Sequence, residues 1–396
     1  MIDPAIDRAV DRVHFLIATS AGALGHYGHL MRHMAAAGHE VHLWTMEPID
    51  PARAAAHIPR VHCHRLPLGR SETSPLRALR TIARGIRLAA AGEASLFTTW
   101  SVQTNLLCGL PLRAWNRRCI FLVPGLGTIF SSDRRGFRLA SRAITPLYRW
   151  MFRGPASRVI VLNRDDLAFM TDVIGVPRDR IFVMHGGCGV DPAEFPFVEQ
   201  LPAQRIVLVP ARLIREKGIF EAARASRILL DRGVDHEMWF SSDVDLGNPL
   251  TLSRAEVASL PQLSPAIRIL GYQRTMPPVF QAAYAVCLPT YREGVPTALV
   301  EASATGRPIV TTDAVGARDL IRHEHNGLRV PIGDALALAD ALERVLTDGA
   351  LADRLRRNAY AHYLAHCTQQ RTLLQALPAY RSLGLTTPAP AATSCG

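Results

Sequence analysis

Short apolar runs alternate with longer segments of helical periodicity along almost the whole chain. Parallel strands need a crossover connection, usually a helix, so this alternation predicts βαβ units and parallel sheets with helices on both faces. The expected strands are 13–18, 41–44, 61–65, 96–99, 120–123, 159–162, 181–184, 206–210, 238–240, 267–270, 285–289, 309–311 and 328–330.

The alternation is interrupted once, in a proline-containing stretch of poor periodicity over 192–202. A chain of 396 residues has the length of two ordinary domains. The predicted fold class is therefore α/β, with two tandem Rossmann-like doubly wound domains and an inter-domain cleft, where such proteins bind small ligands. The predicted boundaries are 1–195 and 203–350, followed by a helical segment over 351–380 and a disordered tail over 386–396.

The composition excludes several classes of protein. Hydrophobic residues make up 48% of the chain and charged residues 20%, which is typical of a globular protein with packed cores. The sequence has no apolar run of about 18 residues, so we expect no membrane-spanning helix. Its first residues include acids and form no apolar h-region, and its 7 cysteines are scattered without a C-x-x-C pair. These features predict a cytoplasmic protein with reduced cysteines and no secretory signal.

The charge is less ordinary. A formal net charge of +11 indicates a polyanionic partner: nucleic acid, an anionic membrane surface or a phosphate-bearing substrate. The stretch 134–158 contains many arginines and no acid. A second set repeats at the spacing of one helical face: Arg77, Arg80, Arg84 and Arg87. One stripe alone would indicate a solvated basic face, whereas two stripes, the second interleaved with aromatic residues, favour an interfacial surface.

The segment 289–301 combines a strand end, a loop with Glu293 and Gly294, and a helix start. Amides at a helix start bind anions and Gly294 lets the backbone approach a phosphate, so Gly294 and Val295 are assigned to substrate binding. A carboxylate beside a diphosphate would be repelled. Glu293 is therefore predicted to accept a hydrogen bond from a sugar hydroxyl, and Glu301 from a ribose hydroxyl. Two glutamates alone would indicate a solvated surface; the strand, glycine loop and helix around them favour a site.

A second strand end carries two cations. Arg212 and Lys217 follow the strand expected at 206–210, and Gly218 opens the next helix. Their spacing lets both reach one diphosphate, Arg212 as a planar fork and Lys217 as a point charge. Neutralising a departing diphosphate is the step at which a sugar transferase needs most assistance. Arg212, Lys217 and Glu293 are therefore the predicted catalytic residues.

These residues resemble the nucleotide-sugar domain of retaining family 4 glycosyltransferases, which have the two-domain GT-B fold. Arg212 and Lys217 match the family's diphosphate cations, Glu293 and Glu301 match its E-x7-E pair, and 186–191 matches its loop before the inter-domain linker. The resemblance implies that the first domain binds the acceptor and the second the nucleotide sugar. It also implies a retaining reaction that needs no metal or other cofactor.

The first half resembles transferases that extend polyprenyl-diphosphate-linked sugars in surface polysaccharide or glycan assembly, through His26, 38–41 and 123–128. That resemblance implies a UDP-linked hexose or N-acetylhexosamine as donor. It implies an undecaprenyl-diphospho-sugar as acceptor, at the inner face of the cytoplasmic membrane. Gly125 and Gly127 would let a loop pass close to the donor sugar or the acceptor, and His26 would line the acceptor side.

The resemblance also places the donor base near Tyr272, mainly against backbone. Many relatives have a histidine where this chain has Pro124 or the stretch 98–100, so no general base is assigned; in the retaining mechanism the donor phosphate takes the acceptor proton. Asp243 and Asp245 imitate the metal-binding D-x-D motif of the other transferase fold but are interpreted as a surface loop. Pairs of histidines elsewhere lack further ligand partners, so no metal site is predicted.

Three alternatives share part of this evidence. A sugar-nucleotide epimerase of the same fold would also use paired carboxylates, but the first half has no surplus of acids and histidines for acid–base catalysis. For a dinucleotide-dependent oxidoreductase, the glycines over 22–28 have the wrong spacing. A non-catalytic nucleic-acid-binding protein would leave Glu293 and Glu301 without a purpose. The hypothesis kept is a glycosyltransferase with a nucleotide sugar donor, a lipid-linked acceptor and an anionic membrane surface as partners, and no nucleic acid.

Overall fold

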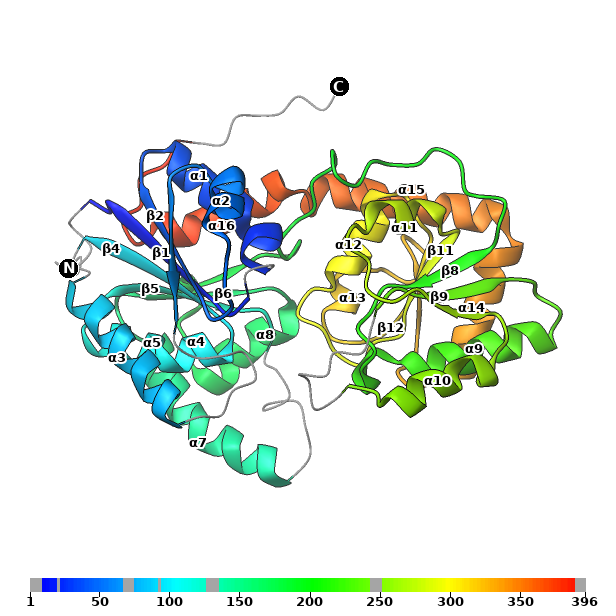
Figure 1. The fold of residues 1–396 in the computed structure, drawn as a ribbon, viewed down its shortest axis with the longest axis horizontal. Coiled ribbons are helices and arrows are strands. Elements are labelled where there is room, and N and C mark those ends of the chain that lie inside the picture. Colours follow the sequence, from blue (N-terminus) through cyan, green and yellow to red (C-terminus); the bar gives the residue numbers. More distant parts are fainter. Residues whose placement is uncertain are drawn as a thin grey trace. The chain divides into compact units, whose positions relative to one another are not determined.

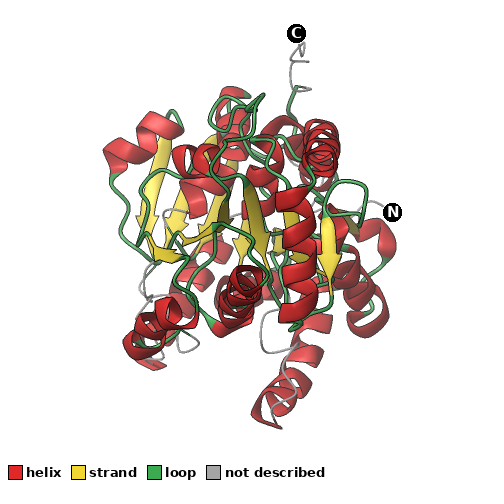
Figure 2. Ribbon diagram, turned by 90° about the vertical axis from the view of Figure 1, so that its right-hand side faces the viewer, coloured by secondary structure: helices red, strands yellow, loops and turns green. Residues whose placement is uncertain are grey.

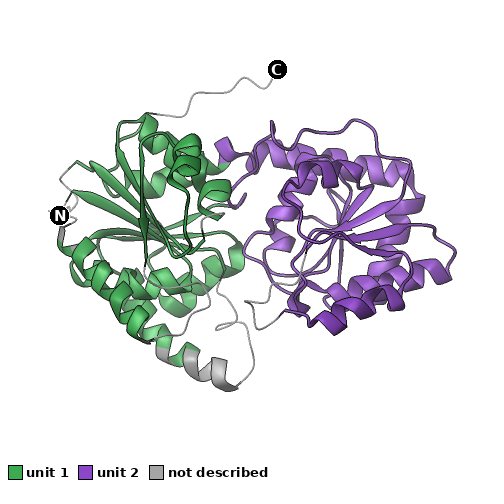
Figure 3. Ribbon diagram, in the orientation of Figure 1, with its two compact units in different colours: residues 1–184, 372–396 green, residues 185–371 purple. Residues whose placement is uncertain are grey.

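The computed structural model describes residues 9–19, 22–66, 75–91, 94–125, 135–242 and 251–388. It divides into two compact units (Figure 3). Unit 1 comprises Met1–Met184 and Thr372–Gly396, and unit 2 comprises His185–Arg371. Within the described ranges, no helix combines the length and the apolar character that crossing a bilayer requires.

Unit 1 is built on a seven-stranded sheet of order β3-β2-β1-β4-β5-β6-β7, in which all neighbouring strands are parallel. The order reverses between β1 and β4, which is the topological switch point of this sheet. The strands are β1 (Arg12–Ile17), β2 (Glu40–Thr45), β3 (Val61–Arg65), β4 (Ser95–Trp100), β5 (Arg118–Val123), β6 (Ser157–Val161) and β7 (Ile181–Val183).

Helices cover both faces of this sheet, because each strand is followed by a crossover. Figure 1 shows α1 (Tyr27–Ala36), α2 (Pro51–His57) and α16 (Gln369–Arg381) on one side. On the other side are α3 (Pro75–Ala91), α4 (Val102–Leu107), α5 (Gly109–Ala114) and α7 (Arg135–Phe152). With both faces covered, the interior strand β5, next to the central strand β4, is buried at every residue. The short helix α8 (Arg164–Ala168) follows β6.

Unit 2 repeats the plan with six parallel strands in the order β10-β9-β8-β11-β12-β13. They are β8 (Ile206–Val209), β9 (Glu237–Phe240), β10 (Ile267–Ile269), β11 (Ala285–Leu288), β12 (Ile309–Thr312) and β13 (Leu328–Val330). The helices around them (Figure 2) are α9 (Ile219–Asp231), α10 (Arg254–Leu263), α11 (Pro277–Ala282), α12 (Thr297–Ala304), α13 (Ala317–Leu320), α14 (Ala335–Thr347) and α15 (Gly349–His366). The order reverses between β8 and β11.

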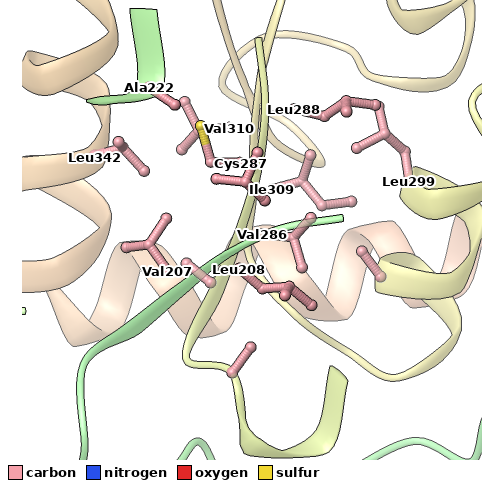
Figure 4. Packing of buried hydrophobic residues seen from close by; sticks show 14 of the residues in the cluster. Val207, Leu208, Ala222, Val286, Cys287, Leu288, Leu299, Ile309, Val310 and Leu342 are labelled. Atoms are coloured by element: carbon pink, nitrogen blue, oxygen red, sulfur yellow. The ribbon is translucent and has the colours of Figure 1, made fainter. Parts of the chain in front are cut away.

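The core of unit 2 lies between these strands and helices (Figure 4). Val207 and Cys287 are fully buried on the adjacent strands β8 and β11. Ala222 of α9 and Leu342 of α14 belong to the same cluster on one side, and Leu299 of α12 belongs to it as well. Continuous apolar strands are thus buried on both faces, as parallel sheets require.

The structure confirms the predicted α/β class with two doubly wound sheets, and each expected strand is present within two residues of its predicted ends. The boundaries differ from the predicted 1–195 and 203–350. The loop after Met184 belongs to unit 2, because Val190 N donates to Cys367 O at 3.0 Å. Most of the predicted tail, 386–396, lies outside the described residues.

The segment predicted as one helical region over 351–380 forms two helices that belong to different units. The helix α15 is part of unit 2, whereas α16 from Thr372 onward is part of unit 1. Pro378 lies inside α16 and does not end it. Tyr380 holds this helix to the sheet, since its buried hydroxyl is 3.0 Å from Thr98 Oγ1 and its ring lies against Phe15.

The first three strands carry a row of histidines. His14 of β1 is in register with His42 of β2. The His14 ring stacks on His42 at 4.5 Å and on Phe97 at 4.8 Å. Trp44 Nε1 donates to His14 Nδ1 at 3.3 Å, which requires that nitrogen to be unprotonated. Burial, followed by the effect of His42, lowers the pKa of His14 from 6.5 to about 3.

The low pKa of His14 makes folding sensitive to acid. Because the folded pKa lies below the unfolded value, the unfolded chain binds protons preferentially between about pH 6.5 and pH 3, so stability is lost as pH falls through that window. One such histidine lowers the free energy of unfolding by about 2 kcal/mol between pH 7 and pH 5. His14→Gln does not titrate and still accepts from Trp44. We therefore expect it to lose about 2 kcal/mol less stability over this interval than the parent chain, in urea unfolding at both pH values.

The control for this prediction is His57→Gln, which removes an exposed histidine of α2. It should keep the acid loss of the parent chain. If His14→Gln and the parent lose stability equally between the two pH values, the buried neutral state of His14 is not the source of the acid sensitivity.

Candidate functional site

The loops that follow β8 and β11 form the candidate site in unit 2. These two strands are neighbours at the point where the strand order reverses, and the carboxyl ends of parallel strands meet at one edge of the sheet. A hydrogen bond joins the two loops directly, from Tyr291 N to Glu216 O at 2.9 Å. The predicted residues Lys217 and Glu293 lie on these two loops.

Gly218 determines how closely the loops approach each other. It follows the 3-10 turn Arg215–Lys217 (η4) with a φ of 68°, in the left-handed region that favours glycine. A Cβ atom at this position would overlap the carbonyl oxygen of Pro289 at the end of β11. Glycine therefore brings the loop after β8 against the loop after β11.

Lys217 and Glu293 form an ion pair between Lys217 Nζ and Glu293 Oε1. Each side chain is 15% exposed, so the charges interact more strongly than those of a surface pair. The buried Thr290 hydroxyl donates to the same carboxylate oxygen at 3.0 Å. Two donors thus hold Oε1, and the second oxygen of Glu293 is the one that can accept from a ligand hydroxyl without displacing either.

The loop that carries Glu293 is also fastened on its other side. The buried Thr312 hydroxyl, at the end of β12, donates to Thr290 O. Glu293 N donates to Val315 O at 3.0 Å, and a Cβ atom on Gly316, whose φ is 80°, would overlap the backbone of this loop. The position of Glu293 is therefore set by three neighbouring strand ends.

The helix α12 starts directly after this loop. Its N-cap is Pro296, which provides no side-chain cap, and the first amides of a helix have no acceptor within it. This end of α12 is therefore suited to an anion. Val295 lies against Gly187, where a Cβ atom would come within 3.0 Å of the Val295 side chain. Glu301 is half-buried on α12, one turn beyond its start.

Lys217 is the only lysine in a sequence with 45 lysines and arginines in total. An arginine would bring a wider planar group into a position that is only 15% exposed. The chain therefore has a compact ammonium group at the position that pairs with Glu293.

The remaining donor-side residues occupy the same edge of the sheet. Arg212 is exposed in the loop after β8. Tyr272 is 77% exposed after β10, where Gly271 turns the chain with a φ of 70°. Because β10 is two strands away from β8, Tyr272 lies farther along the edge than the ion pair. The structure thus brings Lys217 and Glu293 into contact and places Arg212 and Tyr272 along the same edge.

The predicted acceptor residues lie in unit 1. His26 is half-buried at the end of the helical turn Gly22–His26 that follows β1, with its ring 6.3 Å from that of Tyr27. The Tyr27 ring meets the ring of Trp100 at the end of β4, the other strand of this switch point. Gly125 follows β5 with a φ of 143°. Gly127 lies outside the described residues.

Sequence reasoning missed several residues that shape both switch points. Thr290 and Thr312 position Glu293. The only indication of this role in the sequence is that a threonine stands at the end of each of the two strands. Ser101 follows β4 with φ 96° and ψ 156°, a conformation that non-glycine residues rarely adopt and that is frequent at functional sites. No local sequence pattern indicates this conformation.

The described residues contain no group of three or more His, Cys, Asp or Glu side chains arranged to hold a metal ion. His62 and His64 do share a face, since the rings of both stack on His42. Asp243 and Asp245 lie outside the described residues. The cysteines in the described ranges are all free.

The site in unit 2 combines a cation, a helix N-terminus and carboxylates at a switch point. Cations and helix amides neutralise a diphosphate, and carboxylates accept from the hydroxyls of a sugar or ribose. Two doubly wound units, one with such a site, define the class of two-domain glycosyltransferases with the GT-B fold.

Family models identify this class independently. Residues 204–348 match the model described as "Glycosyl transferases group 1", and residues 22–187 match the one described as "Glycosyl transferase 4-like domain". The two models together cover most of the chain, which therefore belongs to this glycosyltransferase family and confirms the resemblance predicted from the sequence.

Several curated relatives are similar over part of their length. The N,N'-diacetylbacillosaminyl-diphospho-undecaprenol alpha-1,3-N-acetylgalactosaminyltransferase of Campylobacter jejuni is 27% identical over 256 residues, which cover 60% of this chain and 64% of that protein. The amylovoran biosynthesis glycosyltransferase AmsK of Erwinia amylovora is 31% identical over 182 residues, 43% of each chain. The match therefore spans less than two thirds of either relative.

A third relative is matched over more of its length. The UDP-Gal:alpha-D-GlcNAc-diphosphoundecaprenol alpha-1,3-galactosyltransferase of Escherichia coli is 22% identical over 294 residues, which cover 70% of this chain and 73% of that protein.

Solved structures share the fold of nearly the whole chain. Sucrose-phosphate synthase from Thermosynechococcus elongatus has a TM-score of 0.78 at 22% identity, covering 94% of this chain and 99% of that chain. Anabaena HepE in complex with UDP and glucose has a TM-score of 0.74 at 16% identity, with the same coverage. At these identities the likeness establishes the fold alone, and it confirms the predicted GT-B architecture.

The close approach at Gly218 is testable by substitution. Gly218→Ala should lower the free energy of unfolding by at least about 3 kcal/mol, because the Cβ atom adds overlap with Pro289 to the cost of a left-handed backbone. Gly233→Ala is the matched control, since Gly233 has a φ of 75° and no atom within 4 Å of an added Cβ. It should lose only about 1 kcal/mol. Equal losses in urea unfolding would show that the two loops do not pack as described.

Proposed function

We propose that this chain transfers a hexose or N-acetylhexosamine from a UDP-linked donor to a polyprenyl-diphosphate-linked acceptor, with retention and without a metal or other cofactor. The observation that carries the proposal is the contact of Lys217 with Glu293 beside the start of α12, at the switch point of unit 2. A cation and a carboxylate thus lie beside a helix end that is suited to an anion, which supports donor binding in unit 2.

In this proposal unit 2 binds the donor. Arg212, Lys217 and the amides at the start of α12 neutralise the diphosphate, which carries the charge that develops as the sugar leaves. A bound diphosphate would compete with Glu293 for Lys217 Nζ and so release Glu293 toward a sugar hydroxyl. Glu301 accepts from the ribose hydroxyls, and Tyr272 lies near the base.

Unit 1 binds the acceptor in this proposal, with His26 and Gly125 lining its side of the reaction. The C. jejuni and E. coli relatives are named for substrates linked to undecaprenol through a diphosphate. Such an acceptor is anionic and anchored in lipid, so the enzyme would work as a peripheral protein at the inner face of the cytoplasmic membrane. The donor phosphate takes the acceptor proton, since no general base is assigned.

The donor site is tested first by isothermal titration with UDP, GDP and ADP. We expect micromolar binding of UDP by the parent chain, weakened at least tenfold in Glu301→Ala and in Arg212→Ala, since a hydrogen bond to a charged group contributes about 1.5–3 kcal/mol.

The matched control is Glu343→Ala, which removes a carboxylate of α14 that pairs with Arg232, the residue after α9. It should bind UDP as tightly as the parent. Absence of binding by folded parent chain with any of the three nucleotides would refute the proposed donor site. Binding that survives both site substitutions would place the nucleotide elsewhere.

Thr290 provides a sharper test, because it touches Glu293 and is itself buried. Thr290→Val keeps the side-chain shape and removes the hydroxyl that positions the carboxylate. We expect the kcat of sugar transfer, measured as UDP formed from the UDP-sugar, to fall about tenfold, which corresponds to about 1.4 kcal/mol of activation free energy. The Kd for UDP should change less than about twofold. Thr290→Ser should restore kcat. A parallel loss of UDP affinity would instead indicate that the loop has collapsed.

A further inference from the structure

Three helices of unit 1, α3, α5 and α7, lie on the same side of its sheet (Figure 1). The helix α3 contacts α5, and α5 contacts α7, so the three form one continuous layer. Gly85 fixes the orientation of α3, because a Cβ atom there would come within 3.3 Å of Cys108 and Pro111 beneath it. The opposite face of α3 is therefore directed away from the sheet.

That outer face of α3 carries large apolar side chains in exposed positions. Leu76 is 58% exposed, Leu79 62% and Ile86 39%. Their spacing of three and seven residues places them on one side of the helix. Burying exposed side chains of this size in an apolar environment is favourable, and a cluster of them on one helix indicates a binding surface.

Arginines flank this apolar row. Arg77, Arg80 and Arg87 are exposed on α3 beside the leucines and the isoleucine. Arg84, in contrast, is half-buried with its guanidinium 4.8 Å from the centre of the Trp44 ring. Three of the four arginines in the predicted stripe are thus exposed, and the fourth packs against the sheet.

The same layer exposes two tryptophans. Trp115 follows α5 and Trp150 lies on α7, and each is 45% exposed. The guanidinium of Arg113 lies 5.0 Å from the centre of the Trp150 ring and its Nε donates to Trp150 O at 3.2 Å. Tryptophan beside a cation is typical of the boundary between lipid headgroups and acyl chains.

The charge of this layer has one sign. Within the described parts of 75–125 and 135–158 there is no aspartate or glutamate. The exposed arginines of α7 and the residue after it add to those of α3: Arg142, Arg149 and Arg153. The described residues of these helices therefore contribute positive charge and no negative charge, which matches an anionic surface.

We propose that this basic-apolar face, formed by Leu76, Leu79, Ile86, Trp115 and Trp150 with the exposed arginines of α3 and α7, docks on an anionic lipid bilayer. The arginines bind the headgroups, and the apolar side chains insert into the interface. A nucleic acid would use the arginines and tryptophans but gives exposed leucine and isoleucine no partner, so lipid is favoured. The inference rests on the proposed function only in that a lipid-linked acceptor requires a membrane.

The test separates charge from insertion with two variants. Leu76→Ser/Leu79→Ser/Ile86→Ser keeps every charge, and Arg77→Gln/Arg80→Gln/Arg87→Gln keeps every apolar side chain. The probe is sedimentation with phosphatidylcholine vesicles that contain roughly one third phosphatidylglycerol. We expect the arginine variant to bind about 100-fold more weakly, roughly fivefold per arginine, and the serine variant at least about tenfold more weakly.

The matched control removes the same charge from exposed positions of unit 2, in Arg224→Gln/Arg254→Gln/Arg322→Gln, and should bind vesicles as the parent does. Insertion is followed separately by tryptophan emission, which should shift to shorter wavelength with anionic vesicles and lose most of that shift in Trp115→Phe/Trp150→Phe. UDP titration of every variant without vesicles reports folding and the donor site independently.

Vesicle binding by the serine variant equal to that of the parent would overturn insertion. Equal binding by the arginine variant would overturn the assigned face. Failure of the parent chain to bind anionic vesicles, together with arginine-dependent binding of a duplex oligonucleotide, would assign the face to nucleic acid instead. Intact vesicle binding without any nucleotide binding would refute the proposed function and leave this inference standing.

Discussion

The partly buried ion pair between Lys217 and Glu293 is the interaction on which the rest of the candidate site depends. Two charges with little exposure to water are stable only when each is satisfied, and removing one leaves the other unpaired. Here the glutamate is satisfied by the lysine and by Thr290, and the lysine is brought into range because Gly218 lets two loops meet. A ligand that supplies negative charge to Lys217 takes the place of Glu293 in this pair. Glu293 then keeps the Thr290 hydroxyl as a donor and is free to accept from a hydroxyl of the same ligand.

The sequence predicted the sheets well because parallel strands are buried on both faces and therefore stand out as continuous apolar runs. It also predicted Lys217 and Glu293, since a cation and a carboxylate each follow a strand that ends at the same edge. It failed where contacts across the chain decide the outcome. The helix break near Cys367 depends on pairing with Val190, and the path of α16 depends on Tyr380, two partners that are far away in sequence. The constraint at Ser101 is likewise set by its surroundings and by no local pattern.

The two halves of the molecule use arginine in different ways. In unit 2 several arginines at the surface have acidic partners, as Arg232 does with Asp340 and Glu343. In unit 1 the described residues of α3, α5 and α7 include several arginines and no acid. The net charge of +11 is therefore not spread evenly over the surface. The helices that carry the excess determine where an anionic partner would bind.

The return of α16 to unit 1 has a consequence for synthesis on the ribosome. Unit 2 is one continuous stretch, His185–Arg371, and has all of its strands once that stretch has emerged. Unit 1 begins first but receives its last helix after unit 2 is complete, and until then Phe15 and Thr98 lack the side chain of Tyr380 that covers them. The half that is translated first is thus the half that finishes folding last, and the part of its sheet that α16 covers stays open to water during the synthesis of the other half.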